Sequence, residues 1–180
     1  MRNFLFSLFI CFLSTNVFAS DLHSWKTTQG VKVYFKEQNE LPIIDMAIVD
    51  DFGSRNAPPG HALIMMNTLA NGSKYFTKDK IHQFLRDQGI RSNQNLLRNY
   101  NILTYRFLST QETSNILDAV EMTALKPTFP AKEILQEVRS QSTSILDRHV
   151  SIPALAVDKI LKELFPESPN FHAPLEGSLN

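Results

Sequence analysis

The side chains of this sequence that most readily bind a metal ion are its histidines, and their spacing is unfavourable. Two histidines hold zinc from one helix when they are four positions apart, because both rings then lie on the same face. No two histidines of this chain have that spacing; they are His23, His61, His82, His149 and His172. The histidine pattern therefore does not predict a helical zinc pair.

Other polar motifs fit a structural role better than a functional one. Asp50 and Asp51 can bind a cation, but a solvated loop start is the better interpretation, and His82 fits a solvated helix face better than a ligand position. Asn71-Gly72-Ser73 matches the glycosylation acceptor pattern, but Asn71-Gly72 fits a helix C-cap better. No combination of Ser, His and Asp is marked by its spacing. Composition and spacing alone therefore predict no active site.

Residues 1–19 predict a cleavable secretory signal peptide. Arg2 supplies a positive charge, an apolar run extends from Phe4 to Leu13, and Val17-Phe18-Ala19 fits the small-residue rule for cleavage before Ser20. The apolar run is shorter than the roughly 20 residues of a membrane span, although an uncleaved interfacial anchor is the alternative. Because Cys11, the one cysteine, leaves with this segment, we expect a periplasmic or otherwise secreted chain without disulfides or Cys metal ligands.

The charge balance argues against nucleic-acid and membrane partners. The chain has 18 Lys and Arg residues against 18 Asp and Glu residues, without a basic stripe or a block of like charge. Nucleic-acid and anionic membrane surfaces are usually bound through such basic clusters. The remaining residues 20–180 are enough for one domain with a core of its own.

The hydrophobic pattern predicts an α+β domain in which an antiparallel sheet packs against several helices. The predicted strands cover residues 31–36, 43–49 and 103–107, and residues 91–101 are expected to be a partner strand or a loop. The first two strands are closely joined and are therefore expected to be antiparallel neighbours. The predicted helices cover residues 61–70, 77–89, 111–125, 131–147 and 153–165, and residues 166–180 are expected to be mostly loop.

The same pattern predicts which positions are buried. We expect the strand over 43–49 to be more fully buried than the strand over 31–36. The buried positions expected on the last two helices are Ile134, Leu135, Val138, Ile145, Val157, Ile160, Leu161 and Leu164.

A series of short segments resembles a known family when the segments are taken in order. They are Trp25-Lys26-Thr27, Gly30-Val31-Lys32-Val33-Tyr34, Leu41-Pro42, Asp51-Phe52-Gly53-Ser54-Arg55, Pro59-Gly60-His61-Ala62, Asn71-Gly72-Ser73, Leu117-Asp118 and Pro127-Thr128-Phe129-Pro130. From residue 25 to about residue 178, the series resembles the N-terminal domain of the pitrilysin/insulinase family of zinc metallopeptidases. The resemblance also implies that the chain is truncated. Family members usually have two such domains, and residues 20–180 stop before the closing strand of the first.

The resemblance implies that the catalytic motif of the family is lost. Active members carry His-x-x-Glu-His on the first helix, in which the two histidines bind zinc and the glutamate is the general base. The resemblance places these positions at Leu63, Met66 and Asn67. It places the third zinc ligand at Val138, with Glu137 one position away. It therefore implies no catalytic residue, metal or cofactor in this chain, with zinc expected only in an active sibling.

Three functions are compatible with the resemblance. The first is a catalytically silent, exported family member that pairs with an active zinc-peptidase sibling, so that the two form a chamber holding an unfolded peptide. The second is a non-proteolytic scaffold or binding protein of the same fold, like the core subunits of the respiratory bc1 complex. The third, an active zinc endopeptidase, is disfavoured because neither His-x-x-Glu-His nor His-Glu-x-x-His occurs in the sequence.

Overall fold

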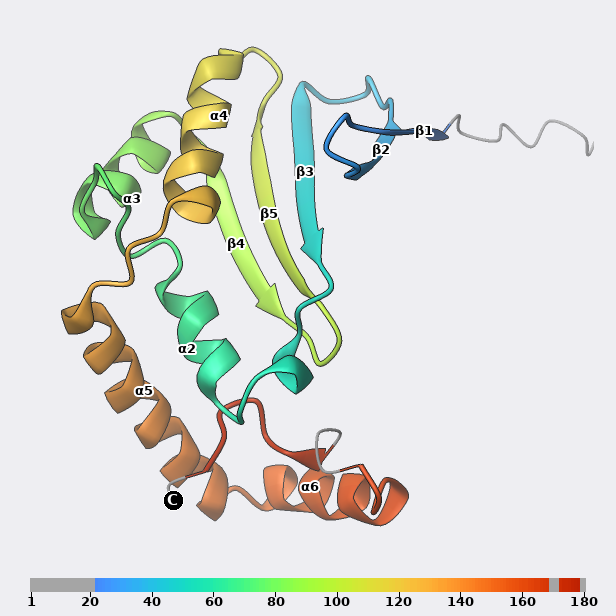
Figure 1. The fold of residues 1–180 in the computed structure, drawn as a ribbon, viewed down its shortest axis with the longest axis vertical. Helices are drawn as coiled ribbons and strands as arrows, with labels where there is room; N and C mark the ends of the chain where they lie inside the picture. Colours follow the sequence, from blue (N-terminus) through green and yellow to red (C-terminus); the bar gives the residue numbers. More distant parts are fainter. Residues whose placement is uncertain (1–21, 169–171, 179–180) are drawn as a thin grey trace, which may run out of the picture. The chain divides into compact units, whose positions relative to one another are not determined.

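The computed structural model describes residues 22–168 and 172–178, so the predicted signal peptide lies outside the described residues. The described residues belong to two compact units that meet between Leu41 and Pro42. Figure 1 shows the elements within each unit. In chain order they are β1 (Leu22–Lys26), β2 (Lys32–Lys36), β3 (Ile43–Asp50), η1 (Ser54–Asn56), α2 (His61–Thr68), α3 (Lys78–Asp87), β4 (Arg91–Leu96), β5 (Asn101–Leu108), α4 (Thr113–Val120), η2 (Glu121–Leu125), α5 (Ala131–Val150) and α6 (Ile152–Leu164).

The first unit contains an antiparallel hairpin of β1 and β2. The N–H of Gly30 donates to the carbonyl of Thr27 over 2.9 Å and closes the turn. Gly30 has a φ of 85°, which lies in the left-handed region that favours glycine. The sequence predicted β2 but not β1, because the segment Leu-His-Ser-Trp-Lys lacks a clear alternation of apolar and polar residues.

The predicted pairing of the strands over 31–36 and 43–49 is wrong. β2 pairs with β1, and β3 pairs with β5, with Ile43 opposite Leu108 and Asp50 opposite Asn101. A short connection was the physical argument for the predicted pairing. That argument fails because β2 pairs with β1, a strand that the sequence did not predict, and β3 pairs with the distant β5.

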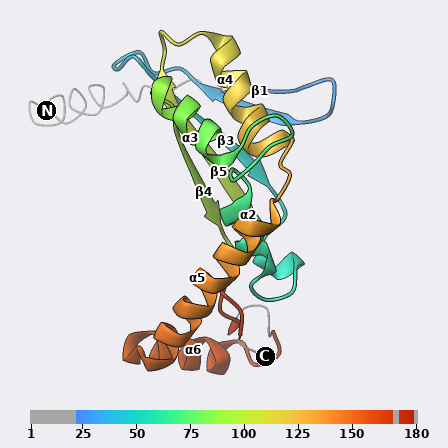
Figure 2. The ribbon, with the colours of Figure 1, turned by 90° about the vertical axis from the view of Figure 1, so that its left-hand side faces the viewer.

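The second unit is built on a three-stranded antiparallel sheet in the order β3-β5-β4. Along the central strand β5, Leu103, Tyr105 and Phe107 are buried, whereas Thr104 and Arg106 between them are exposed. Helices α2, α3 and α4 lie on the face of the sheet that carries the buried side chains (Figures 1 and 2). The structure confirms the strand predicted over 103–107, and residues 91–96 supply its predicted partner strand.

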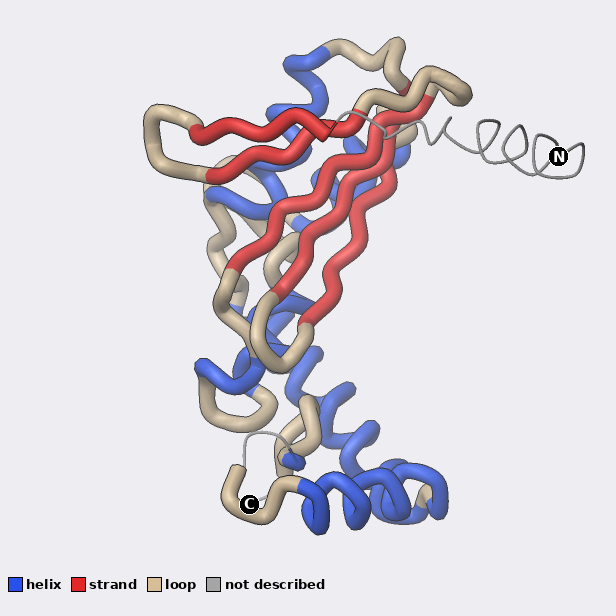
Figure 3. The backbone as a smooth tube through the Cα atoms, turned by 90° about the vertical axis from the view of Figure 1, so that its right-hand side faces the viewer, coloured by secondary structure: helices blue, strands red, loops and turns tan. Residues whose placement is uncertain are grey.

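The opposite face of this sheet is not covered by the described helices of the second unit (Figure 3). On it, the Arg106 guanidinium donates to both carboxylate oxygens of Asp45, with distances of 2.6 and 2.8 Å. This hydrogen-bonded guanidinium lowers the pKa of Asp45, but an ion pair so exposed contributes little stability. Ile44 and Val49 of β3 are exposed. As an edge strand, β3 is only partly buried, but it is more buried than β2, as predicted. Met46 and Ile48 of β3 pack against the core, whereas Val33 is the one residue of β2 that is not exposed.

The hydrophobic core lies between the sheet and helices α2, α3 and α4. Its buried members are Ala62, Met66, Leu69, Ile81, Leu85, Ile90, Leu96, Leu103, Tyr105, Phe107, Ala119 and Met122. They come from β4, β5, the three covering helices and the turns that adjoin them, so one shared core holds the sheet and helices α2, α3 and α4 together.

Helices α5 and α6 are formed as predicted, but most of their predicted buried positions are not buried. Ile145 is buried, whereas Leu135, Val138, Val157, Ile160 and Leu164 are exposed. α6 lies beyond the end of the sheet (Figure 1), where its main contact is α5, including the Arg148–Asp158 ion pair. Its apolar positions therefore have no sheet to pack against. None of the described helices has the length and hydropathy of a membrane span.

The segment after α4 changes helix type. Residues Glu121–Leu125 form a π-helical turn, in which the N–H of Lys126 donates to the carbonyl of Glu121 over 3.2 Å. The Thr123 hydroxyl donates to the Ala119 carbonyl over 2.7 Å and lies 2.7 Å from the Tyr105 hydroxyl. Because Thr123 has one hydroxyl proton and uses it on Ala119, Tyr105 is the donor in the second bond. This buried bond ties the π-helical turn to the centre of the sheet.

Replacing Tyr105 by phenylalanine tests this bond. The variant Tyr105→Phe should lower the free energy of unfolding by about 1 kcal/mol, the usual value of one neutral hydrogen bond. Burial raises the pKa of Tyr105 above its ordinary value. The unfolded chain therefore ionises first, so this contribution to stability is present below pH 10 and is lost as the pH rises through the folded pKa. Urea unfolding at pH 7 and pH 11 should show a smaller alkaline loss in Tyr105→Phe than in the unchanged chain. An equal loss in both would contradict this assignment.

Candidate functional site

Helix α2 carries the three positions at which the resemblance places the zinc motif, and a glycine fixes where the helix begins. Gly60 has a φ of 85°, a conformation that other residues rarely adopt. Its carbonyl accepts a hydrogen bond from the N–H of Ile64 over 3.1 Å. It accepts another from Nε2 of Gln141 on α5 over 3.2 Å. The turn at Gly60 and helix α5 together position the first turn of α2.

The three motif positions have different environments on α2. Leu63 is partly buried against the core, and Met66 is 2% exposed within it. Asn67 is exposed and points away from the core, toward α5. Its Nδ2 donates a hydrogen bond to Oε1 of Glu137 over 2.7 Å. The structure therefore joins one of the predicted positions to a carboxylate that is 70 residues away in sequence.

Of the neighbours Glu137 and Val138 on α5, Glu137 is the one whose side chain is hydrogen-bonded to α2. The Glu137 side chain is half-buried and accepts the hydrogen bond from Asn67. Val138 is 39% exposed and belongs to a different face of the helix. Successive residues of an α-helix are separated by about 100° around its axis, so a shift of one position changes which side chain faces a neighbouring helix. The structure thus brings Glu137 to the α2 position Asn67, while the assignment of the third-ligand position to Val138 stays a prediction.

The residues at these positions do not fit a zinc ion. Leu63 has a hydrocarbon side chain, and Met66 is packed in the core. Asn67 presents its amide N–H₂, a donor group, to Glu137, whereas zinc needs imidazole nitrogen, thiolate or carboxylate ligands. Within residues 22–168 and 172–178, no three or more His, Cys, Asp or Glu side chains are placed so that they can hold a metal ion. The Asn67–Glu137 contact therefore joins α2 to α5 through a hydrogen bond between side chains.

Three other candidate side chains contact nearby backbone groups. Asp50 Oδ1 accepts a hydrogen bond from the N–H of Phe52 over 3.2 Å, as expected for an aspartate at a loop start. The rings of His61 and His149 lie within hydrogen-bond distance of the carbonyls of Pro59 and Ile145.

The predicted C-cap at Asn71-Gly72 is wrong. α2 ends at Thr68, and Gly72 instead forms an isolated bridge with Thr77. A Cβ at Gly72 would lie 2.7 Å from Cγ of Pro130, so the position requires glycine because the chain segments approach closely there.

Comparison with solved structures identifies the fold. A peptidase M16 inactive domain from Pseudomonas fluorescens superposes with a TM-score of 0.80 and 25% sequence identity, over 86% of this chain. A putative M16-like peptidase from Alicyclobacillus acidocaldarius gives a TM-score of 0.73 at 10% identity over 88% of this chain. A protease from Helicobacter pylori gives 0.68 at 15% identity over 89%.

The coverage of these structures is partial. This chain spans 38% of the P. fluorescens and A. acidocaldarius chains and 39% of the H. pylori chain. No protein-family model and no curated protein matches the sequence. The structure has the α+β organisation with antiparallel strands that the sequence predicted. The chain therefore has the M16 peptidase fold, and the resemblance to the pitrilysin-type peptidases that was drawn from its sequence is confirmed.

Proposed function

We propose that this chain is an exported, catalytically silent member of the pitrilysin-type peptidase family. It pairs with an active zinc-peptidase sibling, which supplies the zinc and the catalytic residues. The pair encloses an unfolded peptide, and this chain supplies one wall of the enclosure.

The observation that carries the proposal is the contact between α2 and α5. The side chains that face each other there are an amide and a carboxylate, Asn67 and Glu137. The position of the general base is occupied by Met66, which is buried and cannot accept a proton. The description of the P. fluorescens structure as an inactive domain agrees with the loss of catalysis.

Exposed apolar surface supports a protein partner. Leu146 and Val150 of α5 are exposed, as are Ile152, Val157 and Ile160 of α6. Several large apolar side chains exposed on two adjacent helices are a common property of protein interfaces. In the proposed pair, the sibling covers these side chains.

The edge of the sheet supports a peptide-binding role. β4 is one of the two outer strands in the order β3-β5-β4, and it is the one that contacts α2. An outer strand offers backbone N–H and C=O groups to an extended peptide, which can add to the sheet as a further strand. Its residues Arg91–Leu96 are mostly polar, so a peptide bound there would be held largely through its backbone.

The first test is the metal content and activity of this chain alone. The purified mature chain should contain far less than one zinc ion per molecule and should not cleave unfolded peptides. Elemental analysis after dialysis and a fluorogenic peptide assay measure both properties. About one tightly held zinc ion per chain, or cleavage that a chelator abolishes, would refute the silent role.

The second test is the partnership. We expect the chain to be recovered from the periplasm together with a protein that carries an intact His-x-x-Glu-His motif. Ile160→Glu should weaken the complex roughly tenfold by placing a charge in an apolar interface, whereas Lys162→Glu on the same helix should change it little. If the chain is monomeric and no such sibling accompanies it, the scaffold role of the same fold replaces the paired one.

A further inference from the structure

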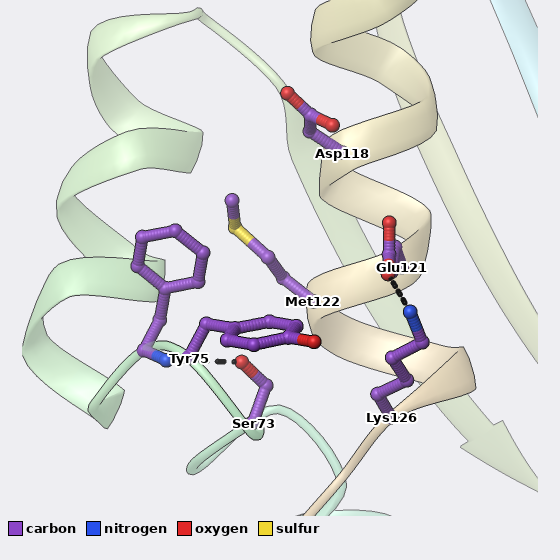
Figure 4. Close-up of a pocket in the computed structure, with 7 residues that line it drawn as sticks. Ser73, Tyr75, Asp118, Glu121, Met122 and Lys126 are labelled. Carbon is purple, nitrogen blue, oxygen red and sulfur yellow. Dashed lines mark hydrogen bonds and ion pairs between the residues drawn. The ribbon is translucent and has the colours of Figure 1, made fainter.

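A small pocket lies between the segment that follows α2 and the π-helical turn, on a part of the molecule that the proposed function does not use. Its volume is about 170 Å³. Figure 4 shows its lining, which comprises Ser73, Tyr75, Phe76, Asp118, Glu121, Met122 and Lys126. Pockets for drug-sized molecules usually have about 300 to 1,000 Å³. This pocket therefore has the size for a single amino-acid side chain.

The first wall of the pocket is held in place by hydrogen bonds. The N–H of Ser73 donates to the Phe76 carbonyl over 2.9 Å, and the N–H of Phe76 donates to the Ser73 hydroxyl over 3.2 Å. The N–H of Lys74 donates to the Lys126 carbonyl over 3.2 Å, which attaches this wall to the opposite one. Tyr75 nevertheless remains 62% exposed. The backbone thus presents an aromatic ring to solvent from a fixed position.

The second wall is the π-helical turn over Glu121–Leu125. The buried bond between Tyr105 and Thr123 fixes this turn from the core side. Met122 is directed into the pocket from the turn, beside the ring of Tyr75 (Figure 4). Isolated π-helical turns are rare and occur frequently at functional sites. Both walls are therefore pre-formed, which lowers the entropy cost of binding.

The chemistry of the pocket combines an apolar floor with an acidic rim. Tyr75, Phe76 and Met122 supply the apolar surface, and Asp118 and Glu121 supply two carboxylates. Lys126 pairs with Glu121, so the charge of that carboxylate is neutralised. Asp118 forms no ion pair within the part of the chain that the structure describes. The lining therefore has one negative charge without a counter-charge.

The ring of Tyr75 already attracts cations. The ammonium groups of Lys74 and Lys126 lie 5.2 and 5.9 Å from its centroid, within the range of cation–π attraction. Lys74 lines the neighbouring hollow and not this pocket. The apolar side chains of the pocket match the methylene stem of a long basic side chain, and Asp118 matches its charged end. Arginine fits better than lysine, because its planar guanidinium pairs with a carboxylate through two hydrogen bonds.

We infer that this pocket binds an arginine side chain of an extended polypeptide. The stem of the arginine packs against Tyr75 and Met122, and its guanidinium pairs with Asp118. The inference stands apart from the proposed function, because it uses neither the α2–α5 contact nor the edge of β4.

The test is a titration of the mature chain, labelled with ¹³C at its methionine methyl groups, with an acetylated and amidated peptide Gly-Ser-Arg-Ser-Gly. The methyl resonance of Met122 should shift in a saturable manner. A peptide with citrulline in place of arginine has the same shape without the charge, and it should bind about tenfold more weakly or not at all. Asp118→Asn should weaken binding of the arginine peptide by a similar factor. Asp147→Asn, at an exposed acid on α5, is the matched control and should leave binding unchanged.

Three results of this titration would overturn the inference. The first is the absence of a saturable Met122 shift with the arginine peptide. The second is equal binding of the citrulline peptide, and the third is an equal effect of Asp118→Asn and Asp147→Asn; either would indicate non-specific contact. Tyr75→Ala is a second variant that tests the apolar floor. Because the Tyr75 ring is largely exposed, this variant should remain folded and lose binding. Unchanged binding by folded Tyr75→Ala would equally reject the pocket.

Discussion

The double substitution Leu63→His with Asn67→His should create a zinc site that binds about one zinc ion per chain. Positions 63 and 67 are four apart on α2, so both imidazoles would project from one helical face. The Glu137 carboxylate already lies 2.7 Å from the Asn67 amide and can supply a third ligand. Three protein ligands of this type are sufficient for zinc. Met66 is left unchanged, because a glutamate at that core position would bury a charge.

The matched control removes only the third ligand. Adding Glu137→Gln to the double variant should weaken zinc binding by about 100-fold or more, since even residues that merely support metal ligands contribute about 10- to 100-fold. Elemental analysis and competition with a chromogenic chelator measure stoichiometry and affinity. A folded double variant that takes up no zinc would show that Glu137 is not positioned as a ligand. An unaltered affinity after Glu137→Gln would show that another group replaces it.

The sequence predicted the type and approximate bounds of most elements, because hydrophobic periodicity records which face of an element is apolar. It did not predict what covers that face. Ile160 belongs to an apolar stripe typical of a buried helix, yet it is 55% exposed, since α6 lies beyond the sheet. Strand β1 was not predicted, because its side chains carry no apolar pattern. It pairs through its backbone, and its side chains are exposed.

The sequence supports the assignment of the motif positions on α2 better than the assignment on α5. The segment from Gly60 to Gly72 is anchored by two glycines, so Leu63, Met66 and Asn67 could be assigned to the motif positions without an insertion. The long helix offers no such anchor near Glu137, and there a shift of one residue rotates the side chain by about 100°. The contact between Asn67 and Glu137 joins residues 70 positions apart. A pairing at that distance depends on how two helices pack, which local patterns do not record.

Gly60→Ala should be among the most destabilising single substitutions in this chain, with a loss of roughly 3 kcal/mol in the free energy of unfolding. Two effects add. Gly60 has a φ of 85°, which strains any residue with a Cβ. A Cβ there would also lie 2.6 Å from the carbonyl oxygen of Glu176 and 2.6 Å from Nε2 of Gln141. The carbonyl belongs to the backbone and cannot rotate away, so the segment around Glu176 must move.

Gly89→Ala separates these two effects. Gly89 also has a positive φ, 64°, but a Cβ there would meet no atom within 4 Å. Gly89→Ala should therefore lower the free energy of unfolding only by the backbone-strain contribution, which is about 1 kcal/mol. Urea unfolding of both variants, monitored by far-ultraviolet circular dichroism, gives the two free energies. A difference of about 2 kcal/mol is expected from the steric contact alone. Equal losses of free energy in the two variants would mean that the segment around Glu176 is not packed against Gly60. The start of α2 would then be fixed by its own turn, and not by α5 and the residues that follow α6.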